Sequence, residues 1–479
     1  MPGKVLLISV NRCVSPSPVF PLGLAYLEAA LRPAGYETHW LDRQAEARSV
    51  REAAAAFKPD FVGISLRNID DVVIRRRETF FDPLRTMIAE IREVCAAPVI
   101  LGGSGFSIFP EALLEASGAD FGIQGEGEAS LLALLKALEH RADHSAIPGL
   151  VYRHNGSVVA NPAQRLNLAE LPRADRPDSV LSYYLRETGM ANLQTQRGCS
   201  CHCEYCTYPL IEGPRFRRRP AEAIAEEMAD LQRRGVKYVF IVDSIFNSSP
   251  EHVRQVCEAI LHRNLKLRWT CFLRPAGLTA ELMQLMARAG LAHVEFGADS
   301  FCDSVLAAYG KRFTFADVHR SHELARQAKI ECCHFLICGG PGETLETLEE
   351  GFQNSLRLPE TAILALVGMR IYPGTALHAQ VCRERPLPPD NQLLQPHYYL
   401  SDAVTEDAVF ARLQDFSRRS PNWIVGDPPP RYVELAARLR SRGVIGPLWS
   451  YWCTAQRLAP ALVQSPSSLT SAASTAFSP

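Results

Sequence analysis

Short apolar segments alternate with amphipathic segments along most of this chain, and the alternation limits the folds open to it. In the first third, mainly apolar runs of strand length cover residues 5–10, 61–66, 99–103 and 121–124. Between them, apolar positions recur at helical spacing over residues 22–31, 81–94 and 129–139. This order favours a parallel sheet wrapped on both faces, with ligands bound beyond the carboxyl ends of its strands. We expect an α/β, doubly wound (Rossmann-like) domain over residues 1–140.

The same alternation resumes at residue 192. Strands are predicted over residues 192–196, 238–242, 268–273, 293–297 and 332–338. Helices are predicted over residues 221–233, 251–263, 280–289 and 315–329. Such a series is typical of a whole or partial (β/α) barrel, whose chemistry collects at the carboxyl ends of the strands. We assign this domain to residues 191–375.

The remaining segments carry other signals. A hairpin turning at Asn155-Gly156 and a proline-rich connector over residues 162–177 predict a hairpin and linker over 141–190. Residues 376–455 mix helical patterns with aromatic loops, which predicts a mostly helical carboxy-terminal cap over the barrel mouth. Residues 456–479 are rich in Ser, Ala and Thr, a composition typical of a disordered tail.

The composition limits the partners and the cell compartment that we expect. A formal net charge of -1 gives no reason to expect nucleic acid as a partner, and no apolar run approaches the roughly 20 residues that span a bilayer. The 14 cysteines come without an amino-terminal signal segment, so the reducing cytoplasm is the expected compartment.

Four of those cysteines fall within eight positions, just after the first predicted barrel strand. Cys199, Cys203 and Cys206 have the spacing Cys-x3-Cys-x2-Cys. Three thiolates on one loop can hold three irons of a 4Fe-4S cluster and leave the fourth iron open. Structural zinc is the alternative, but no second ligand pair follows. Cys201 is then a spare thiol.

This motif resembles that of the radical S-adenosylmethionine (SAM) superfamily. The resemblance implies that the open iron binds the amino and carboxylate groups of SAM, whose reductive cleavage gives a 5'-deoxyadenosyl radical. It also implies an external electron donor such as flavodoxin or ferredoxin. Tyr205 stands in the aromatic position that such enzymes often place before the last cysteine.

Residues at other predicted strand ends resemble the superfamily's SAM-binding positions. Asp243-Ser244 matches the place of its Gly-Gly-Glu motif without the glycines, and Asp299 replaces the glutamate of its Gly-x-Glu-Ser turn. Gly339-Gly340 resembles a turn near adenine and ribose, and Arg274 is positioned to reach the SAM carboxylate. For each, a helix cap or a salt bridge at the barrel rim is the alternative.

Glycine turns follow two strands of the first domain. The segments Gly102-Gly103-Ser104 and Gly125-Glu126-Gly127-Glu128, together with residues 21–27, resemble the cobalamin-binding domain that precedes the radical SAM domain in one large subfamily. The Asp-x-His-x-x-Gly motif that supplies a histidine to cobalt is missing, since Asp42-Arg43-Gln44 is the only similar place. Arg67 is our candidate for the lower axial face of the corrin. A cap, or a salt bridge with Asp70 or Asp71, is the alternative.

Together these resemblances imply a cobalamin-dependent radical SAM enzyme that methylates an unactivated carbon of a small specialised metabolite, using two SAM molecules. One SAM would supply the methyl group through cobalamin, and the other would supply the radical. The alternatives are a radical rearrangement or cyclisation, an aminocarboxypropyl transfer without cobalamin, and a cluster-based sensor. No catalytic side chain is identified from the sequence.

Overall fold

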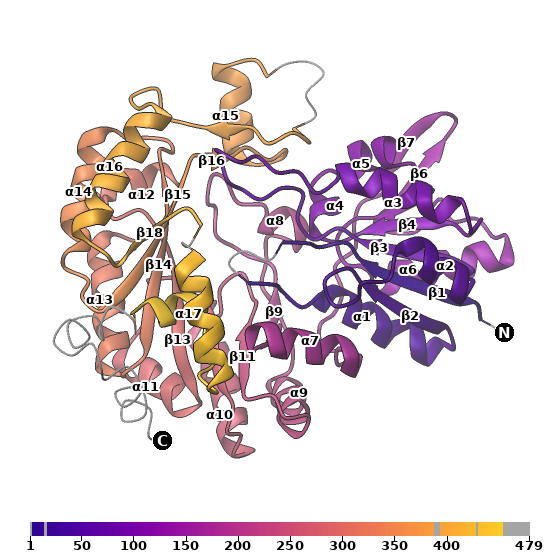
Figure 1. Ribbon diagram of the computed structural model, residues 1–479, viewed down its shortest axis with the longest axis horizontal. Helices are drawn as coiled ribbons and strands as arrows, with labels where there is room; N and C mark the ends of the chain where they lie inside the picture. Colours follow the sequence, from indigo (N-terminus) through magenta and orange to yellow (C-terminus); the bar gives the residue numbers. More distant parts are fainter. Residues whose placement is uncertain (1, 14–16, 388–392, 428–429, 454–479) are drawn as a thin grey trace.

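The computed structural model describes residues 2–13, 17–387, 393–427 and 430–453. Two units built on parallel sheets lie side by side, the first coloured indigo to purple and the second pink to yellow (Figure 1). The predicted tail over residues 456–479 lies outside the described residues. Within the described residues, no helix is both long and apolar enough to cross a membrane.

The first unit contains a seven-stranded sheet in the order β2-β1-β3-β4-β5-β6-β7. Its parallel strands are β1 (Lys4–Ser9), β2 (Glu37–Asp42), β3 (Phe61–Ser65), β4 (Val99–Gly102) and β5 (Phe121–Ile123). Along β1, Val5 and Leu7 enter one apolar core while Leu6 and Ile8 enter another, so both faces of the sheet are buried. The predicted doubly wound α/β fold is confirmed.

Helices cover both faces of this sheet. On one face, α1 (Leu22–Leu31) packs against α6 (Gly127–His140). On the other, α3 (Asp82–Arg92) contacts both α2 (Val50–Phe57) and α5 (Pro110–Ser117). The core beside α1 and α6 continues into the second unit through α7 (Asp178–Thr188), where the Tyr184 hydroxyl donates to Asp42 at 2.9 Å. The two units therefore share a core.

The predicted hairpin consists of β6 (Leu150–His154) and β7 (Ser157–Ala160), and Asn155 and Gly156 at its turn both have positive φ. Its placement differs from the predicted linker. β6 pairs with β5 in antiparallel fashion, so the hairpin extends the first sheet. Leu150 and Val151 are buried there, which explains the pairing.

The second unit is a partial barrel, as predicted. Its sheet has the order β18-β15-β14-β13-β12-β11-β8, and every pairing in it is parallel. The strands are β8 (Ala191–Leu193), β11 (Tyr238–Ile241), β12 (Arg268–Leu273), β13 (Leu291–Asp299), β14 (Glu331–Cys338), β15 (Thr361–Val367) and β18 (Trp423–Val425).

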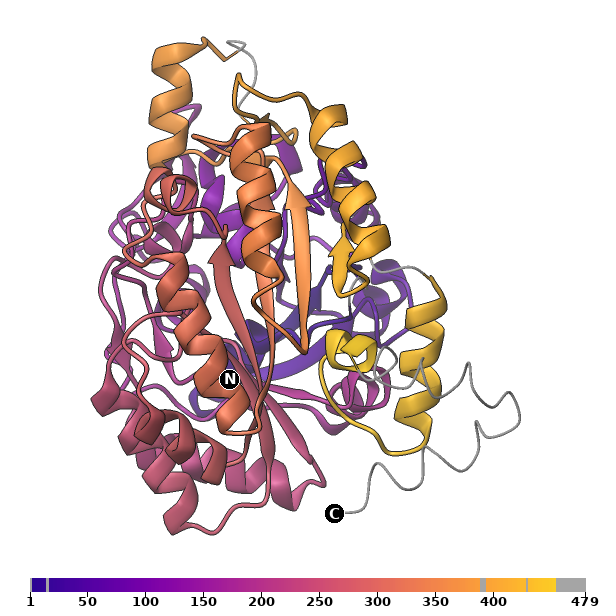
Figure 2. The same cartoon turned by 90° about the vertical axis from the view of Figure 1, so that its left-hand side faces the viewer.

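Helices cover the outside of this sheet, and Figure 2 shows those of its later half in front of the strands. They are α9 (Ala221–Arg233), α10 (Pro250–His262), α11 (Ala280–Arg288), α13 (Phe315–Gln327), α14 (Leu345–Ser355) and α16 (Glu406–Arg419). Side chains of Ser249, Thr279 and Thr405 accept hydrogen bonds from the first turns of α10, α11 and α16, which fixes where these helices begin.

The carboxy-terminal region is mostly helical, with α15 (Ala376–Glu384), α16 and α17 (Pro430–Ser441), but it does more than cap the barrel. It supplies β18, the edge strand of the barrel sheet. The shorter elements of the whole chain are η1 (Arg32–Ala34), α4 (Ser104–Ile108), β9 (Gln196–Arg197), α8 (Tyr208–Ile211), β10 (Arg217–Arg218), α12 (Asp303–Ala308), β16 (Met369–Arg370) and β17 (Tyr398–Tyr399).

Candidate active site

A cavity of about 610 Å³ lies between the carboxyl ends of the two sheets. The last residues of four strands of the first unit line it, namely Ser9, Ser65, Gly102 and Ile123. From the second unit, Arg197 and Thr207 reach it, and these residues stand on either side of the cysteine loop, residues 199–206. The cavity therefore lies next to both the predicted cobalamin-binding turns and the cysteine loop.

The glycine turn after β4 lies directly against the segment that leaves β3. Gly103 has φ +96°, and a Cβ there would come within 2.6 Å of the Leu66 carbonyl oxygen, so only glycine fits without strain. The amide of Gly105 donates to the same carbonyl at 3.0 Å, and the Ser104 hydroxyl donates to the Arg67 carbonyl at 2.8 Å. This turn holds the Arg67 backbone at the cavity wall.

The Arg67 side chain lines the cavity, and no hydrogen bond or ion pair to it is found among the described residues. The alternative salt bridges are wrong, because Asp70 pairs with Arg370 at 2.8 Å and Asp71 pairs with Arg76. The Arg67 side chain is exposed at this wall, so a ligand in the cavity can reach its guanidinium. Arg67 is thus a cation held beside a cavity without a carboxylate partner in the described protein.

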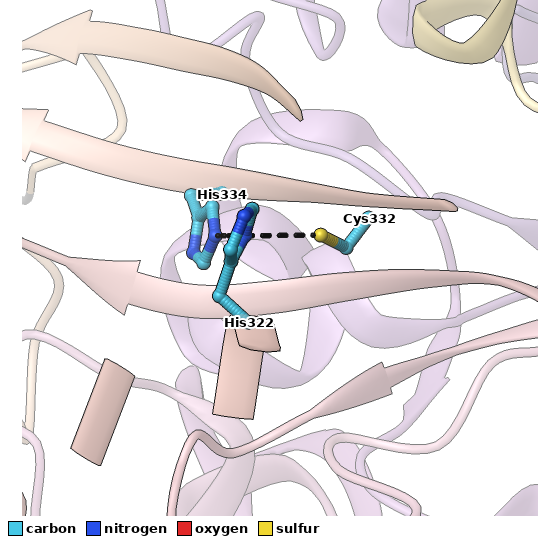
Figure 3. Close-up of side chains that lie close together, drawn as sticks. All are labelled: His322, Cys332 and His334. Carbon is cyan, nitrogen blue, oxygen red and sulfur yellow. Dashed lines mark hydrogen bonds between the residues drawn. The ribbon is translucent and has the colours of Figure 1, made fainter. Parts of the chain in front are cut away.

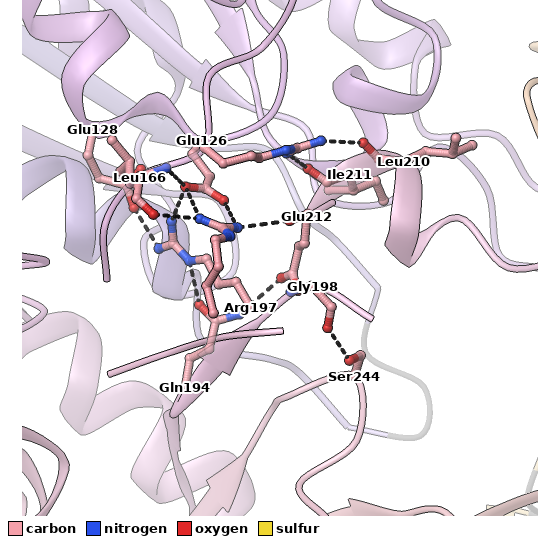
Figure 4. Close-up of polar contacts among 12 residues, drawn as sticks. Glu126, Glu128, Leu166, Gln194, Arg197, Gly198, Leu210, Ile211, Glu212 and Ser244 are labelled. Atoms are coloured by element: carbon pink, nitrogen blue, oxygen red, sulfur yellow. Dashed lines mark hydrogen bonds and ion pairs between the residues drawn. The ribbon is translucent and has the colours of Figure 1, made fainter. Parts of the chain in front are cut away.

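The turn after β5 reaches across to the second unit (Figure 4). Glu128 accepts a hydrogen bond from Arg197 at 2.6 Å, and Glu126 accepts one from Arg217 at 3.0 Å. All of these carboxylates and the Arg197 guanidinium are buried. Gly125 and Gly127 line the cavity beside them. The predicted cobalamin turn therefore also joins the two units by ion pairs.

The cysteine loop is bound at its entry by several backbone contacts. The Gly198 amide donates to Glu212 at 2.9 Å, the Gly198 carbonyl accepts from Ser244 at 2.9 Å, and the Cys199 amide donates to the Gly213 carbonyl at 3.0 Å. Gly198 has φ +92°, and a Cβ would lie 2.1 Å from the Arg215 carbonyl oxygen. The glycine before the first cysteine is thus required by close backbone packing.

The donor set of this loop fits an iron-sulfur cluster. Cys199, Cys203 and Cys206 are free thiols on a single short loop, and the thiols of Cys199 and Cys201 lie within hydrogen-bond reach. Burial raises the pKa of Cys206 to about 12, so iron binding there must displace a proton.

Tyr205 and Asp299 are brought together beside the cysteines. The Tyr205 hydroxyl donates to Asp299, and Lys311 forms an ion pair with the same carboxylate. Asp299 has φ +65°, which places its carboxylate at the end of β13 in a left-handed conformation. A direct contact of either predicted residue with SAM stays a prediction, since Asp299 already has two partners within the protein.

Asp243, at the end of the β11 region, is fully buried. It accepts hydrogen bonds from the amide and hydroxyl of Thr195, so it braces the segment between β8 and β9. Ser244 holds Gly198, as described above. Their predicted contacts with the amino group of SAM stay predictions.

The predicted contact of Arg274 with the SAM carboxylate also stays a prediction, and one observation supports it. Its guanidinium reaches the Cys201 thiol, and its Nε atom is buried without a hydrogen-bond partner among the described residues. A buried donor of this kind suits a carboxylate such as that of SAM.

Gly339 and Gly340 are packed against the protein itself. A Cβ on Gly339 would lie 2.6 Å from Leu400, and one on Gly340 would lie 2.5 Å from the Tyr309 hydroxyl. Side chains therefore already explain both glycines, and their predicted place near adenine and ribose stays a prediction.

The cavity also fits cobalamin. Its wall carries the unpaired Arg67 guanidinium and two buried polar atoms with no partner among the described residues, Asn11 Nδ2 and Glu128 Oε2. The amide side chains of a corrin supply both donors and acceptors, so they can satisfy groups of either kind.

Sequence reasoning missed several residues of this site. Arg197, Glu212 and Tyr208 line the cavity, and Lys311 lies beside the cysteine loop. Only Arg197 carried a signal, because it directly precedes Gly198-Cys199.

A second group of potential metal ligands lies outside the site. His322, Cys332 and His334 are buried between α13 and β14, and none of them lines the cavity (Figure 3). His322 Nδ1 lies 3.3 Å from both His334 Nε2 and the Cys332 sulfur, and His322 Nε2 lies 2.9 Å from the Pro359 carbonyl oxygen. These contacts form a hydrogen-bonded packing cluster within the barrel wall.

Comparisons with known proteins agree with this geometry. Residues 193–353 match the radical SAM superfamily model, and residues 8–135 match the B12 binding domain model. Hopanoid C-3 methylase of Methylococcus capsulatus is 26% identical over 383 residues, 76% of this chain and 70% of that protein. The anaerobic magnesium-protoporphyrin IX monomethyl ester cyclase of Rubrivivax gelatinosus is 26% identical and covers 70% of this chain and 61% of its own length.

A solved structure and a curated relative both cover most of this chain. The radical SAM methyltransferase TsrM from Kitasatospora setae, solved with cobalamin and a [4Fe-4S] cluster bound, has a TM-score of 0.82 at 25% identity over 97% of this chain and 100% of that chain. Tryptophan 2-C-methyltransferase of Streptomyces laurentii is 31% identical over 444 residues, 78% of this chain and 74% of that protein. The predicted cofactors, a 4Fe-4S cluster, SAM and cobalamin, are confirmed for the family. The chain belongs to the family of cobalamin-dependent radical SAM methyltransferases.

Proposed function

We propose that this methyltransferase transfers a methyl group from SAM, by way of cobalamin, to an unactivated carbon of a small specialised metabolite. The observation that carries the proposal is the single cavity bordered by the cobalamin-type turns of one unit and by both ends of the cysteine loop of the other. Two cofactors that must exchange with one substrate need such a shared space.

When bound, the cofactors supply methyl transfer and radical formation, and the protein's part is to hold and orient them. Cys199, Cys203 and Cys206 would ligate the cluster, and Arg274 would bind the SAM carboxylate. Gly102, Gly103, Ser104 and the Gly125–Glu128 turn would contact the corrin.

Arg67 would lie near the lower face of the corrin, where a cation without a protein partner disfavours the binding of water to cobalt. Its position at the cavity wall and the lack of a salt bridge to Asp70 or Asp71 support this role. Substitution of Arg67 by Lys, which keeps the charge but changes its reach, should alter the cobalamin absorbance spectrum and slow methylation. An unchanged spectrum and rate would contradict the axial role.

The substrate class is a proposal from the relatives, one of which acts on tryptophan by its name. An external one-electron donor such as flavodoxin or ferredoxin would reduce the cluster. The matched cyclase supports one second candidate, a radical cyclisation or rearrangement on the same scaffold.

One anaerobic experiment tests these alternatives. The protein is reconstituted with iron, sulfide and cobalamin, then given SAM, a reductant and candidate small molecules. Radical methylation with two SAM gives S-adenosylhomocysteine and 5'-deoxyadenosine in similar amounts. A cyclisation gives 5'-deoxyadenosine without S-adenosylhomocysteine, which would contradict methylation.

Cysteine variants test which residues bind the cluster. Replacement of Cys199, Cys203 and Cys206 by Ala should abolish bound iron above background and both SAM products. Cys201→Ala should retain the cluster, since Cys201 lies outside the three-cysteine spacing. Iron content and the cluster's absorbance measure both outcomes.

A further inference from the structure

We infer that Glu128 couples cobalamin in the cavity to the position of the cysteine loop, an inference that rests on the proposed function. The two oxygens of this buried carboxylate differ. Oε1 accepts a hydrogen bond from Arg197 at 2.6 Å, whereas Oε2 has no partner among the described residues. Because Glu128 lines the cavity, an amide N–H of a bound corrin can supply the missing donor.

From Arg197 a series of hydrogen bonds leads to the residue before Cys199, the first predicted cluster ligand. Arg197 Nε donates to Gln194 at 2.9 Å, and Gln194 in turn donates to Glu212 at 3.0 Å. The other oxygen of Glu212 accepts the Gly198 amide at 2.9 Å. The peptide before Cys199 is therefore held by side chains that end at the cavity wall (Figure 4).

A parallel connection runs from the same turn. Glu126 pairs with Arg217, whose guanidinium also donates to the Glu212 carbonyl at 2.8 Å. Arg197 and Arg217 are directly opposite each other in the antiparallel pair β9–β10. Two carboxylates of one turn thus bind two arginines of one strand pair, which makes the contact stiff and balanced in charge.

The physical consequence is a reciprocal linkage. A ligand that fixes Glu128 restricts Arg197 and, through it, Gly198 and Cys199. If cobalamin favours the ordered cysteine loop by some factor, an assembled cluster must raise cobalamin affinity by the same factor. Coupling of this kind is commonly about tenfold.

The test measures the dissociation constant of hydroxocobalamin by absorbance titration of the full chain, with the cluster assembled and after its removal. In the wild type, cobalamin should bind about tenfold more tightly when the cluster is present. Glu128→Gln keeps the shape of the side chain but loses its charge, so the two constants should become equal. If Glu128 had a purely structural role, the variant would raise both dissociation constants by the same factor and leave their ratio unchanged.

Glu139→Gln is the matched control. Glu139 lies on the same helix, α6, but it contacts Tyr36 at 3.0 Å and does not line the cavity. Its variant should keep the wild-type ratio. An unchanged ratio in Glu128→Gln, or a ratio of one in the wild type, would overturn the inference.

Hydrogen exchange of the wild type tests the coupling without any variant, which matters if Glu128→Gln does not fold. In the cluster-free protein, saturating hydroxocobalamin should slow amide exchange in the peptide over residues 194–203. Unchanged exchange while cobalamin is bound would overturn the coupling alone. Failure of cobalamin to bind at all would overturn the proposed function as well.

Discussion

The carboxyl edges of the two sheets face one cavity, but they differ in whether their polar groups have partners within the protein. At the first edge, the Arg67 guanidinium and Glu128 Oε2 have no protein partner among the described residues. At the barrel edge, Asp243 is bound by Thr195, and Asp299 is bound by Lys311 and Tyr205. Arg274 Nε is the exception there.

This difference separates binding from stability. A buried polar atom without a partner, such as Glu128 Oε2, is costly, so its retention indicates a ligand that completes it. The Arg67 side chain is instead exposed to the cavity, where a ligand can reach its charge. A group that is already satisfied stabilises the protein and gives no such indication. Substitutions of the unpartnered groups should therefore change cofactor binding, whereas substitutions of the satisfied groups should change the free energy of unfolding.

The largest loss of stability is expected for Asp243→Ala. The substitution leaves the buried amide of Thr195 without its acceptor and removes one of two partners of the Thr195 hydroxyl, which also lies 2.9 Å from His252 Nε2. The loss should cost about 3 kcal/mol in the free energy of unfolding. Denaturant unfolding of the purified protein measures the change. Ser244→Ala, which removes one hydrogen bond to Gly198, serves as the milder control. A wild-type midpoint for Asp243→Ala would remove the distinction between the two edges.

Gly340→Ala should destabilise the protein by about 2 kcal/mol. The new methyl group would meet the Tyr309 hydroxyl, which is fixed by hydrogen bonds to the Ile337 carbonyl at 2.7 Å and the Gly340 amide at 3.1 Å. Gly102→Ala is the matched change at the first edge, where a Cβ lies an ordinary 3.6 Å from the Ile123 carbonyl oxygen. Thermal unfolding should separate the two variants, and equal melting temperatures would contradict the packing argument.

A buried carboxylate inside the barrel should give a pH-dependent effect of similar size. Burial raises the pKa of Glu295 to about 7, with the Trp449 indole N–H donating to it at 3.0 Å. Between pH 4.5 and 7 the folded state holds a proton that the unfolded state releases, so stability from this group is lost as pH rises through 7. Glu295→Gln should come close to the wild type at pH 5 and exceed it by about 2 kcal/mol at pH 8. Denaturant titrations at both pH values test this, and a constant difference would contradict it.

Much of the fold was predictable because its elements carry continuous local patterns. The helix Leu22–Leu31 and the strand Arg268–Leu273 have the bounds that the sequence predicts. β2, Glu37–Asp42, was missed because it is an edge strand whose first half is not buried. β15, Thr361–Val367, has a signal as apolar as that of its neighbours, and the predicted series omitted it.

The site was predictable only where its residues are consecutive. The cysteine spacing and the two glycine turns each consist of residues that are close in the sequence, so each can be recognised as a short motif. The pairing of Glu128 with Arg197 joins residues 69 positions apart, and that of Glu126 with Arg217 joins residues 91 positions apart. Such contacts arise only when the two units meet, so the sequence shows both partners without showing that they pair.

Arg67→Gln should have the smallest effect on folding, because no protein partner of the guanidinium is lost among the described residues. The free energy of unfolding without cofactor should change by no more than about 0.5 kcal/mol. The loss of the cation should nevertheless alter the absorbance spectrum of bound cobalamin, since water can then approach the face that the guanidinium guarded. The opposite result would be a variant that unfolds more easily but leaves the spectrum unchanged. Arg67 would then act as a stabilising group, like the satisfied residues of the barrel edge, and the contrast between the two edges would be wrong for this residue.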